Sequence, residues 1–279
     1  MENLNSEKNS NSTSTSLVMF FLLTFLLSVP FYLLNILAYL KIVGEPEMGA
    51  LYIALFTVTP IASASILTFR KSGSNGLKEL FKRIFDFKRI VKNRWYAVII
   101  FLMPVPYLLT ITGLVLSGAK IPSSLVPLFA LPAVLLFFLL LATGEEVGWM
   151  GYAFEPMQAR FGALKAALIL GIIWAIWHIP IFIFVMQDPV VLIAQLLTLV
   201  GNRILVVWIF NNTGKSVFAT ILFHAVDNTA LVTMPEINTV IPWGSVIFCS
   251  LVLITAFIVT LLWGGKTLNS FKFSGERQA

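Results

Sequence analysis

The sequence is poor in cysteine, in histidine and in charge. It has one cysteine, Cys249, in 279 residues, which excludes a disulfide framework within the chain and a zinc site built from several thiolates. Charged residues make up 11% of the chain and hydrophobic residues 58%, whereas a soluble domain has about 25% charged residues. The composition therefore indicates an integral membrane protein.

Apolar stretches long enough to span a bilayer recur along the chain, since a spanning helix needs roughly 20 predominantly apolar residues. We expect eight of them, at about 17–40, 49–69, 96–117, 125–143, 164–186, 189–210, 216–234 and 240–263. The first is too long for the apolar region of a cleaved signal peptide. The predicted fold is an all-α integral membrane protein with about eight transmembrane helices and a polar active site within the bundle.

The basic residues are distributed unevenly among the predicted loops. Nine of the 19 lysines and arginines lie between the second and third apolar segments. These nine are Arg70, Lys71, Lys78, Lys82, Arg83, Lys88, Arg89, Lys92 and Arg94. Because short cytoplasmic loops carry an excess of Lys and Arg, we place this loop and both termini in the cytoplasm. The apolar residues between the charges favour an amphipathic helix on an anionic membrane surface, and ordinary topology charge explains the pattern equally well.

No repeat or change in composition divides the chain into separate domains. Residues 1–16 are rich in Ser, Asn, Thr and Glu and have little to bury, so we expect a disordered cytoplasmic tail. Residues 17–264 are predicted to form a single polytopic membrane domain, followed by a cytoplasmic tail at 265–279. The expected location is the cell membrane, with membrane lipids as partners and no nucleic acid.

Two adjacent carboxylates, Glu145 and Glu146, follow the fourth apolar segment. Ionisable groups inside a bilayer are costly and mark functional sites, and a buried carboxylate is suited to act as a general base. Neighbouring helical residues point about 100° apart, so usually only one carboxylate faces a given site. The alternative is a charged cap where the helix leaves the membrane.

The chain has two histidines, and both lie in apolar segments. Trp174 and His178 are spaced i, i+4 and share a helix face, on which Gly171 and Ala175 provide small residues for close helix packing. A lone buried histidine is more often a satisfied core residue than a catalyst, so His178 is a weak signal by itself.

The second histidine, His224, is spaced i, i+4 from Asn228. Two hydrogen-bond donors that converge on one point suit the stabilisation of an oxyanion when a carbonyl is attacked. Asp227 is placed to orient His224 or to pair with Arg203. Hydrogen bonding between helices is the alternative role for Asn228 and Asp227.

The order and spacing of these residues resemble the motifs of the CPBP family of intramembrane proteases, which includes the CAAX prenyl endopeptidases and the bacterial Abi proteins. The family pattern is a twin glutamate followed by an arginine, an aromatic-xxx-His motif and a His-xxx-Asn motif. The resemblance covers about 140–230, within a CPBP-like core at about 125–234. Trp174 replaces the usual Phe, which we interpret as conservative, and Met150 stands at the arginine position.

The resemblance implies an intramembrane endopeptidase that hydrolyses a peptide bond of a membrane-associated protein or peptide. We expect Glu145 to act as general base and His178 to hold the attacking water. His224 and Asn228 then stabilise the oxyanion, with Glu146 in support. A divalent metal such as zinc, held by Glu145, His178 and His224, is the alternative; the spacing does not require one.

Met150 leaves Glu146 without the cationic partner that the family pattern provides. We hypothesise that Arg203, an intramembrane arginine in the 189–210 segment, supplies this charge from another helix; the alternative is that its side chain extends to the membrane surface. Met150 also favours a second function class, a non-catalytic family member such as a bacteriocin-immunity or scaffold protein. A small transporter is a third class, which no inverted repeat supports.

Overall fold

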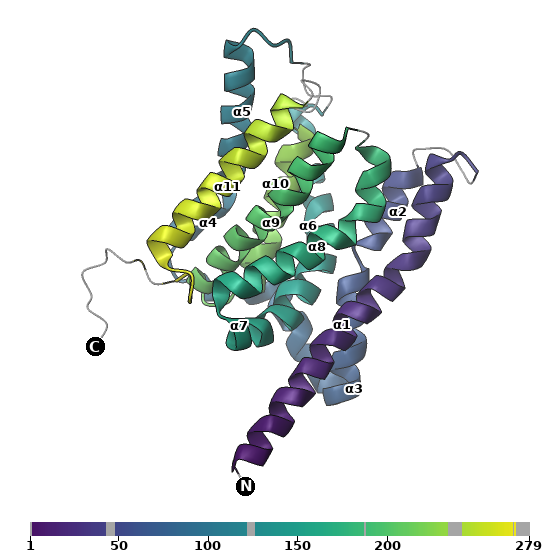
Figure 1. Ribbon diagram of the computed structural model, residues 1–279, viewed down its shortest axis with the longest axis vertical. Helices are drawn as coiled ribbons and strands as arrows, with labels where there is room; N and C mark the ends of the chain where they lie inside the picture. Colours follow the sequence, from purple (N-terminus) through teal and green to yellow (C-terminus); the bar gives the residue numbers. More distant parts are fainter. Residues whose placement is uncertain are drawn as a thin grey trace.

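The structure, a computed structural model, describes residues 2–42, 48–121, 126–186, 188–233, 242–269 and 271. Side chains are described from Thr15 onward, except at 48–50, 53 and 185. The described chain folds into a helical bundle in which α11 and α1 lie at opposite edges, with α9 and α10 between them (Figure 1). The prediction of an all-α membrane protein is confirmed.

The elements fall into longer helices and short connecting ones. The longer helices are α1 (Glu2–Tyr39), α3 (Thr59–Lys82), α6 (Leu131–Gly148), α8 (Ala163–Val185), α9 (Pro189–Asn212), α10 (Val217–Thr233) and α11 (Trp243–Trp263). The shorter ones are α2 (Met48–Phe56), η1 (Arg83–Arg89), α4 (Arg94–Phe101), α5 (Pro104–Leu116), η2 (Leu128–Ala130), η3 (Trp149–Phe154) and α7 (Glu155–Phe161).

Within the described residues, 6 helical stretches are long and apolar enough to cross a membrane. They are Thr15–Tyr39, Arg94–Leu116, Leu128–Phe161, Ala163–Phe184, Pro189–Asn212 and Trp243–Trp263. The two remaining predicted segments are also helical but shorter. The 49–69 segment is divided between α2 and α3, and the 216–234 segment forms α10, which has 17 residues.

The two predicted tails differ in what the structure describes. α1 begins at Glu2, within the predicted 1–16 tail, whose side chains before Thr15 lie outside the described residues, so its disorder stays a prediction. The first residues of the 265–279 tail pack on the bundle. The backbone N–H of Ala163 donates to the Lys266 carbonyl at 2.9 Å, and Asn212 Nδ2 donates to the Leu268 carbonyl at 2.7 Å.

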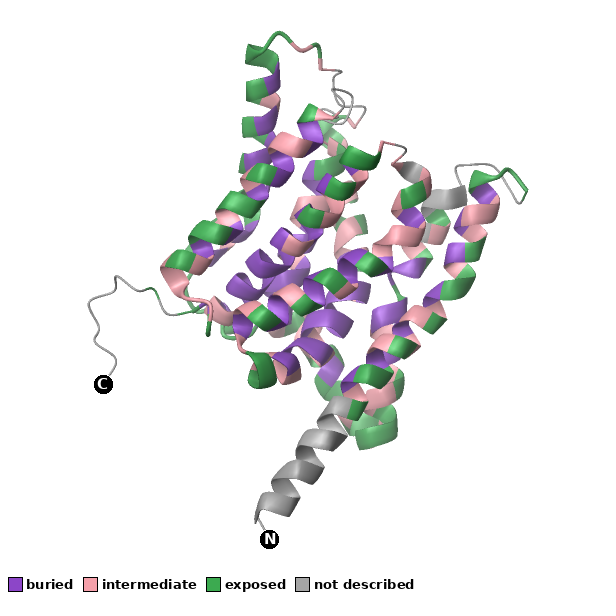
Figure 2. Cartoon of the chain, in the orientation of Figure 1, coloured by how far each residue is buried: buried purple, intermediate pink, exposed green. Residues whose placement is uncertain are grey.

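Helix α9 lies in the interior of the bundle. It contacts α8, α10 and α11, and 61% of its most apolar stretch is buried, more than in any other candidate span. Helix α6 packs against α10 and α3. Figure 2 shows buried residues concentrated on these inner helices. Polar side chains on their facing surfaces are therefore shielded from lipid.

Helix α6 does not end at the twin glutamates. It continues through the π-helical turn η3 and through α7, so that the whole candidate span Leu128–Phe161 has 34 residues. The predicted segment 125–143 is therefore too short. Glu145 and Glu146 are 4% and 0% exposed, so the interpretation of this pair as a charged cap at the membrane boundary is wrong.

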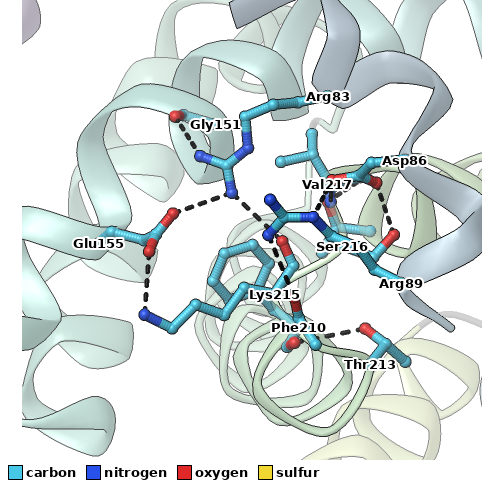
Figure 3. Close-up of polar contacts among 12 residues, drawn as sticks. Arg83, Asp86, Arg89, Gly151, Glu155, Phe210, Thr213, Lys215, Ser216 and Val217 are labelled. Atoms are coloured by element: carbon cyan, nitrogen blue, oxygen red, sulfur yellow. Dashed lines mark hydrogen bonds and ion pairs between the residues drawn. The ribbon is translucent and has the colours of Figure 1, made fainter. Parts of the chain in front are cut away.

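The basic loop packs on the ends of the inner helices, as Figure 3 shows. Arg83 of η1 donates from Nη1 to the Gly151 carbonyl in η3 at 2.7 Å and pairs through Nη2 with Glu155 at 2.9 Å. Lys215, which precedes α10, pairs with the same carboxylate at 3.0 Å. These contacts place basic residues of two predicted cytoplasmic loops at one end of the bundle. Contact of the loop with an anionic membrane surface stays a prediction.

Asp86 of η1 caps the first turn of α10. Its carboxylate accepts hydrogen bonds from Ser216 Oγ at 2.7 Å and from the backbone N–H groups of Val217 at 3.2 Å and Phe218 at 3.0 Å (Figure 3). The first N–H groups of a helix have no partner within the helix, and a negative charge there is favoured by the helix dipole. The basic loop thus stabilises the start of the helix that carries His224.

We expect Asp86→Ala to lower the free energy of unfolding by about 1–2 kcal/mol, the usual cost of losing a helix cap. Thermal unfolding in detergent measures the effect as a lower Tm. The control is Glu79→Ala, because the ion pair between Glu79 and Lys82 is exposed and such pairs contribute about 0–1 kcal/mol. A Tm for Asp86→Ala no lower than that of the control would contradict the capping role.

Candidate active site

Four inner helices contribute polar side chains to one buried cluster. Its members are Glu145 and Glu146 from α6, Trp174 and His178 from α8, Arg203 from α9, and His224 from α10. The structure thus brings together four of the five residues predicted to form the site. The fifth, Asn228, lies one turn beyond His224 on α10 and is half-buried. Within the described residues, no hydrogen bond joins it to the cluster.

Glu146 has two partners on other helices. Arg203 Nη1 lies 2.9 Å from Glu146 Oε2 and 3.1 Å from Oε1, and both side chains of this ion pair are 0% exposed. His224 Nδ1 donates to Glu146 Oε1 at 3.0 Å. The hypothesis that Arg203 supplies a cation to Glu146 from another helix is confirmed by this contact.

Glu145 is held by the tryptophan of the aromatic-xxx-His motif. Trp174 Nε1 donates a hydrogen bond to Glu145 Oε2 at 2.7 Å. The side chain of phenylalanine has no N–H group and makes no such bond. The interpretation of Trp174 as a conservative replacement is therefore wrong, because the indole adds a donor at a carboxylate of the site.

Both carboxylates of the pair belong to the cluster, although they diverge on their helix. The expectation that only one faces the site is wrong, because each carboxylate has a partner on a different helix. Trp174 on α8 reaches Glu145, and Arg203 on α9 reaches Glu146. The guanidinium of Arg203 lies over the Trp174 ring, 4.2 Å from its centroid, which joins the two partners to each other.

The hydrogen bonds of the two imidazoles indicate their tautomers. His178 Nδ1 lies 2.9 Å from the Trp174 carbonyl oxygen; since a carbonyl only accepts, Nδ1 carries the hydrogen and Nε2 of the neutral ring is an acceptor. His224 Nδ1 likewise donates to the Glu146 carboxylate. The Trp174 ring contacts both imidazoles, with centroid distances of 5.1 Å to His178 and 5.5 Å to His224. Both histidines of the chain therefore belong to the cluster.

Asp227 takes neither of the roles considered for it beside His224 and Arg203. Its Oδ2 accepts a hydrogen bond from Asn202 Nδ2 at 2.6 Å, so it joins α10 to α9, which confirms the alternative of interhelical hydrogen bonding for this residue. Sequence reasoning missed Asn202. The available signal was its side-chain amide within an apolar segment, since such groups form hydrogen bonds between membrane helices.

The described histidines and acidic residues are not already gathered as a set of metal ligands. Among the residues that the structure describes, no three His, Cys, Asp or Glu side chains are grouped so as to hold a metal ion. The Nδ1 atoms of His178 and His224 are bonded to a carbonyl and to Glu146, and metal-ligating imidazoles commonly make such bonds through the nitrogen that does not bind the metal. A metal held by Glu145, His178 and His224 stays an alternative prediction.

Comparison with known proteins relates the central part of the chain to a protease family. Residues 127–230 match the model of the type II CAAX prenyl endopeptidase Rce1-like family. This range carries a CPBP-family domain. CAAX prenyl protease 2 of Methanococcus maripaludis is 27% identical over 190 residues, which cover 61% of this chain and 68% of that protein. The CPBP domain contains every residue of the buried cluster, and α1 to α5 and α11 lie outside it.

Met150 lies in the CPBP domain on η3 and is 0% exposed. Glu146, four residues earlier, is nevertheless paired with a guanidinium, because Arg203 reaches it from α9. The missing arginine at position 150 therefore leaves no unpaired carboxylate. This weakens the argument from Met150 for a non-catalytic member of the family.

Proposed function

We propose that the CPBP domain is an intramembrane endopeptidase that hydrolyses a peptide bond of a membrane-associated protein or peptide. The observation that carries the proposal is the buried cluster that brings both glutamates to His178 and His224 from three helices. Paired carboxylates and imidazoles in a site shielded from lipid are suited to move the protons of a hydrolysis. Family membership supports the same reaction class.

In this mechanism Glu145 is the general base. It removes a proton from a water molecule, and the water oxygen attacks the carbonyl carbon of the substrate. His178 holds the same water through Nε2, the acceptor that its bond to the Trp174 carbonyl leaves available. The proton then passes from Glu145 to the amide nitrogen as the C–N bond breaks. Glu145 is a carboxylate again when the acid and amine products leave.

His224 stabilises the negative oxygen of the tetrahedral intermediate. Because Nδ1 is bonded to Glu146, Nε2 is the ring atom that serves the substrate, and it donates when the imidazole is doubly protonated. The Glu146 carboxylate balances the charge of that ring. Asn228, one turn along α10, offers a second donor. Fixed donors in a site that excludes bulk water stabilise such an intermediate strongly.

The substrate class that we propose comes from the relative, whose name describes a prenyl protease. The test uses purified protein in lipid vesicles with a farnesylated peptide that ends in Cys-aliphatic-aliphatic-X, and mass spectrometry detects the released fragment. The matched control is the same peptide without the farnesyl group. We expect cleavage of the farnesylated peptide, at a rate that a metal chelator does not change.

The outcomes test prenyl specificity, protease activity and metal dependence separately. Cleavage of both peptides at equal rates would support a protease without prenyl specificity. If neither peptide is cleaved, proteomes of membranes that express wild type or Glu145→Gln are compared for new cut ends. Identical cut ends in the two membranes, with no peptide cleaved, would remove the protease proposal. Inhibition by the chelator, reversed by added zinc, would show that hydrolysis requires a metal and would contradict the metal-free mechanism.

We further propose that the domain lies in the cell membrane, with the end that carries Arg83 and Lys215 in the cytoplasm. The grouping of basic residues at this end supports the orientation. Both termini are then cytoplasmic. The site would receive its substrate from the surrounding lipid.

A further inference from the structure

Arg203 has contacts that lead to both glutamates of the buried cluster. It pairs with Glu146 and stacks on Trp174, which donates a hydrogen bond to Glu145. We propose that Arg203 is the positioning residue that holds both glutamates, and through Glu146 the imidazole of His224, in their reactive arrangement. The proposal rests on the proposed protease function for its kinetic consequence. Its structural consequence, the fixed orientation of His224, is independent of any substrate.

Two chains of contacts start at the Arg203 guanidinium. Nη1 binds both oxygens of Glu146, at 2.9 Å and 3.1 Å, and Glu146 Oε1 in turn accepts from His224 Nδ1 at 3.0 Å. The guanidinium face lies over the Trp174 ring at 4.2 Å, and Trp174 donates to Glu145 at 2.7 Å. One cation therefore fixes a carboxylate directly and the other through an indole.

The packing of α8 against α9 places Arg203 at this point. A Cβ atom on Gly171 of α8 would lie 3.1 Å from Val200 Cα and 3.2 Å from Arg203 Cβ. The glycine therefore lets α9 approach α8 closely, one turn before Trp174 and at the level of Arg203. The close approach puts the guanidinium within contact of the indole ring. The expectation from sequence that Gly171 serves close helix packing is confirmed.

Stability alone does not account for Arg203. Its side chain is 0% exposed, and neither Nε nor Nη2 has a hydrogen-bond partner among the residues that the structure describes. A buried ion pair has a desolvation cost that often exceeds its attraction, and apolar residues of similar size are often as stabilising. An arginine with two unsatisfied nitrogens is a poor choice for packing. It is a good choice for orienting a carboxylate and an aromatic ring together.

The contacts at position 203 need the guanidinium of arginine, and another cationic side chain would not make all of them. A guanidinium is planar, forms directional hydrogen bonds to a carboxylate and stacks on an aromatic face, whereas an ammonium is a point charge on a flexible chain. Arg203→Lys therefore keeps a positive charge opposite Glu146 but loses the stack on Trp174. Arg203→Met removes both contacts.

The experiment uses the full chain labelled with ¹⁵N-histidine and purified in detergent without a histidine tag. Because the chain has 2 histidines, the imidazole spectrum contains signals of His178 and His224 alone. We expect Arg203→Met to move the His224 signals. His178 signals should move less, since Nδ1 of that ring bonds to a backbone carbonyl. With the farnesylated peptide, kcat should fall by up to about 100-fold, the cost of a small misplacement of the reacting groups, with little change in KM.

Arg203→Lys is the second variant and decides the result if Arg203→Met does not fold. It is expected to shift His224 and lower kcat in the same direction, by less. The matched control is Arg94→Met, the same chemical change at an exposed position at the start of α4. Wild-type His224 signals and wild-type kcat in Arg203→Lys, or in a folded Arg203→Met, would overturn the positioning role. If the wild type cleaves no peptide, the proposed function fails, and the spectra still decide this proposal.

Discussion

Glu145→Gln is expected to lower the turnover number for peptide hydrolysis by about 10²- to 10⁴-fold, the range that a positioned general base contributes. The substitution keeps the shape of the side chain. Its amide oxygen still accepts the hydrogen bond from Trp174 Nε1, which lies 2.7 Å from Glu145 in the wild type. What is lost is the ability to remove a proton from water. Turnover of the farnesylated peptide measures the effect.

The same variant should be at least as stable as the wild type. Glu145 is 4% exposed, and an ionised group in an apolar environment carries a desolvation cost that a neutral amide avoids. Loss of activity at an unchanged or higher Tm therefore separates a catalytic role from a structural one. The control is Glu155→Gln, on the same span but paired with Arg83 and Lys215 at the end of the bundle. This control should keep turnover close to that of the wild type, and near-wild-type turnover in Glu145→Gln would instead remove Glu145 from the chemistry.

The spacing of residues within each helix was sufficient to find most of the site. An i, i+4 spacing places two side chains on one helix face whatever the rest of the fold does, which is why Trp174 and His178 could be paired from sequence. Contacts between helices are not contained in such spacings. Neither the bond from Trp174 to Glu145 nor the bond from His224 to Glu146 follows from the sequence positions of these residues.

The predicted end of the fourth apolar segment lies too early in the chain for a related reason. A charged pair after an apolar run indicates a membrane boundary when each helix is considered alone. In the bundle, Arg203 and His224 on other helices pair with Glu146, so the carboxylates remain inside a span that continues to Phe161. Asp86 is a similar case, because a cap on α10 from the basic loop connects residues far apart in sequence. Hydropathy identifies the helices but not their partners.

The residues around the twin glutamates carry one local signal for close helix packing. Gly144 and Gly148 flank the twin glutamates at the small-xxx-small spacing that lets membrane helices approach closely. In the structure, a Cβ atom on Gly144 would lie 2.6 Å from the Thr57 carbonyl oxygen, and one on Gly148 would lie 2.6 Å from the carbonyl carbon and oxygen of Pro60. The glycine face of α6 therefore packs directly on the backbone of the turn before α3 and of the first residues of α3.

Gly148→Ala is expected to displace α6 from α3 and to remove most activity. The atoms that the new methyl group would meet belong to the Pro60 backbone and ring, which do not rotate away as a flexible side chain does. Overpacking of this kind costs about 1–3 kcal/mol or more. Because Glu145 and Glu146 lie within one turn of Gly148, a displacement of the helix also moves both carboxylates relative to Trp174 and Arg203. We expect a lower Tm and a large loss of turnover.

Gly151→Ala is the matched control, three residues further along the same span. The nearest atom to its added Cβ would be Leu80 Cδ1 at 3.7 Å, an ordinary van der Waals contact. Alanine is favoured over glycine in a helix by about 1 kcal/mol, so this variant should be as stable as the wild type or slightly more stable. The difference between the two variants isolates the close approach of α6 to α3 from the general effect of adding a methyl group. Equal Tm and turnover in the two variants would show that this approach does not position the twin glutamates.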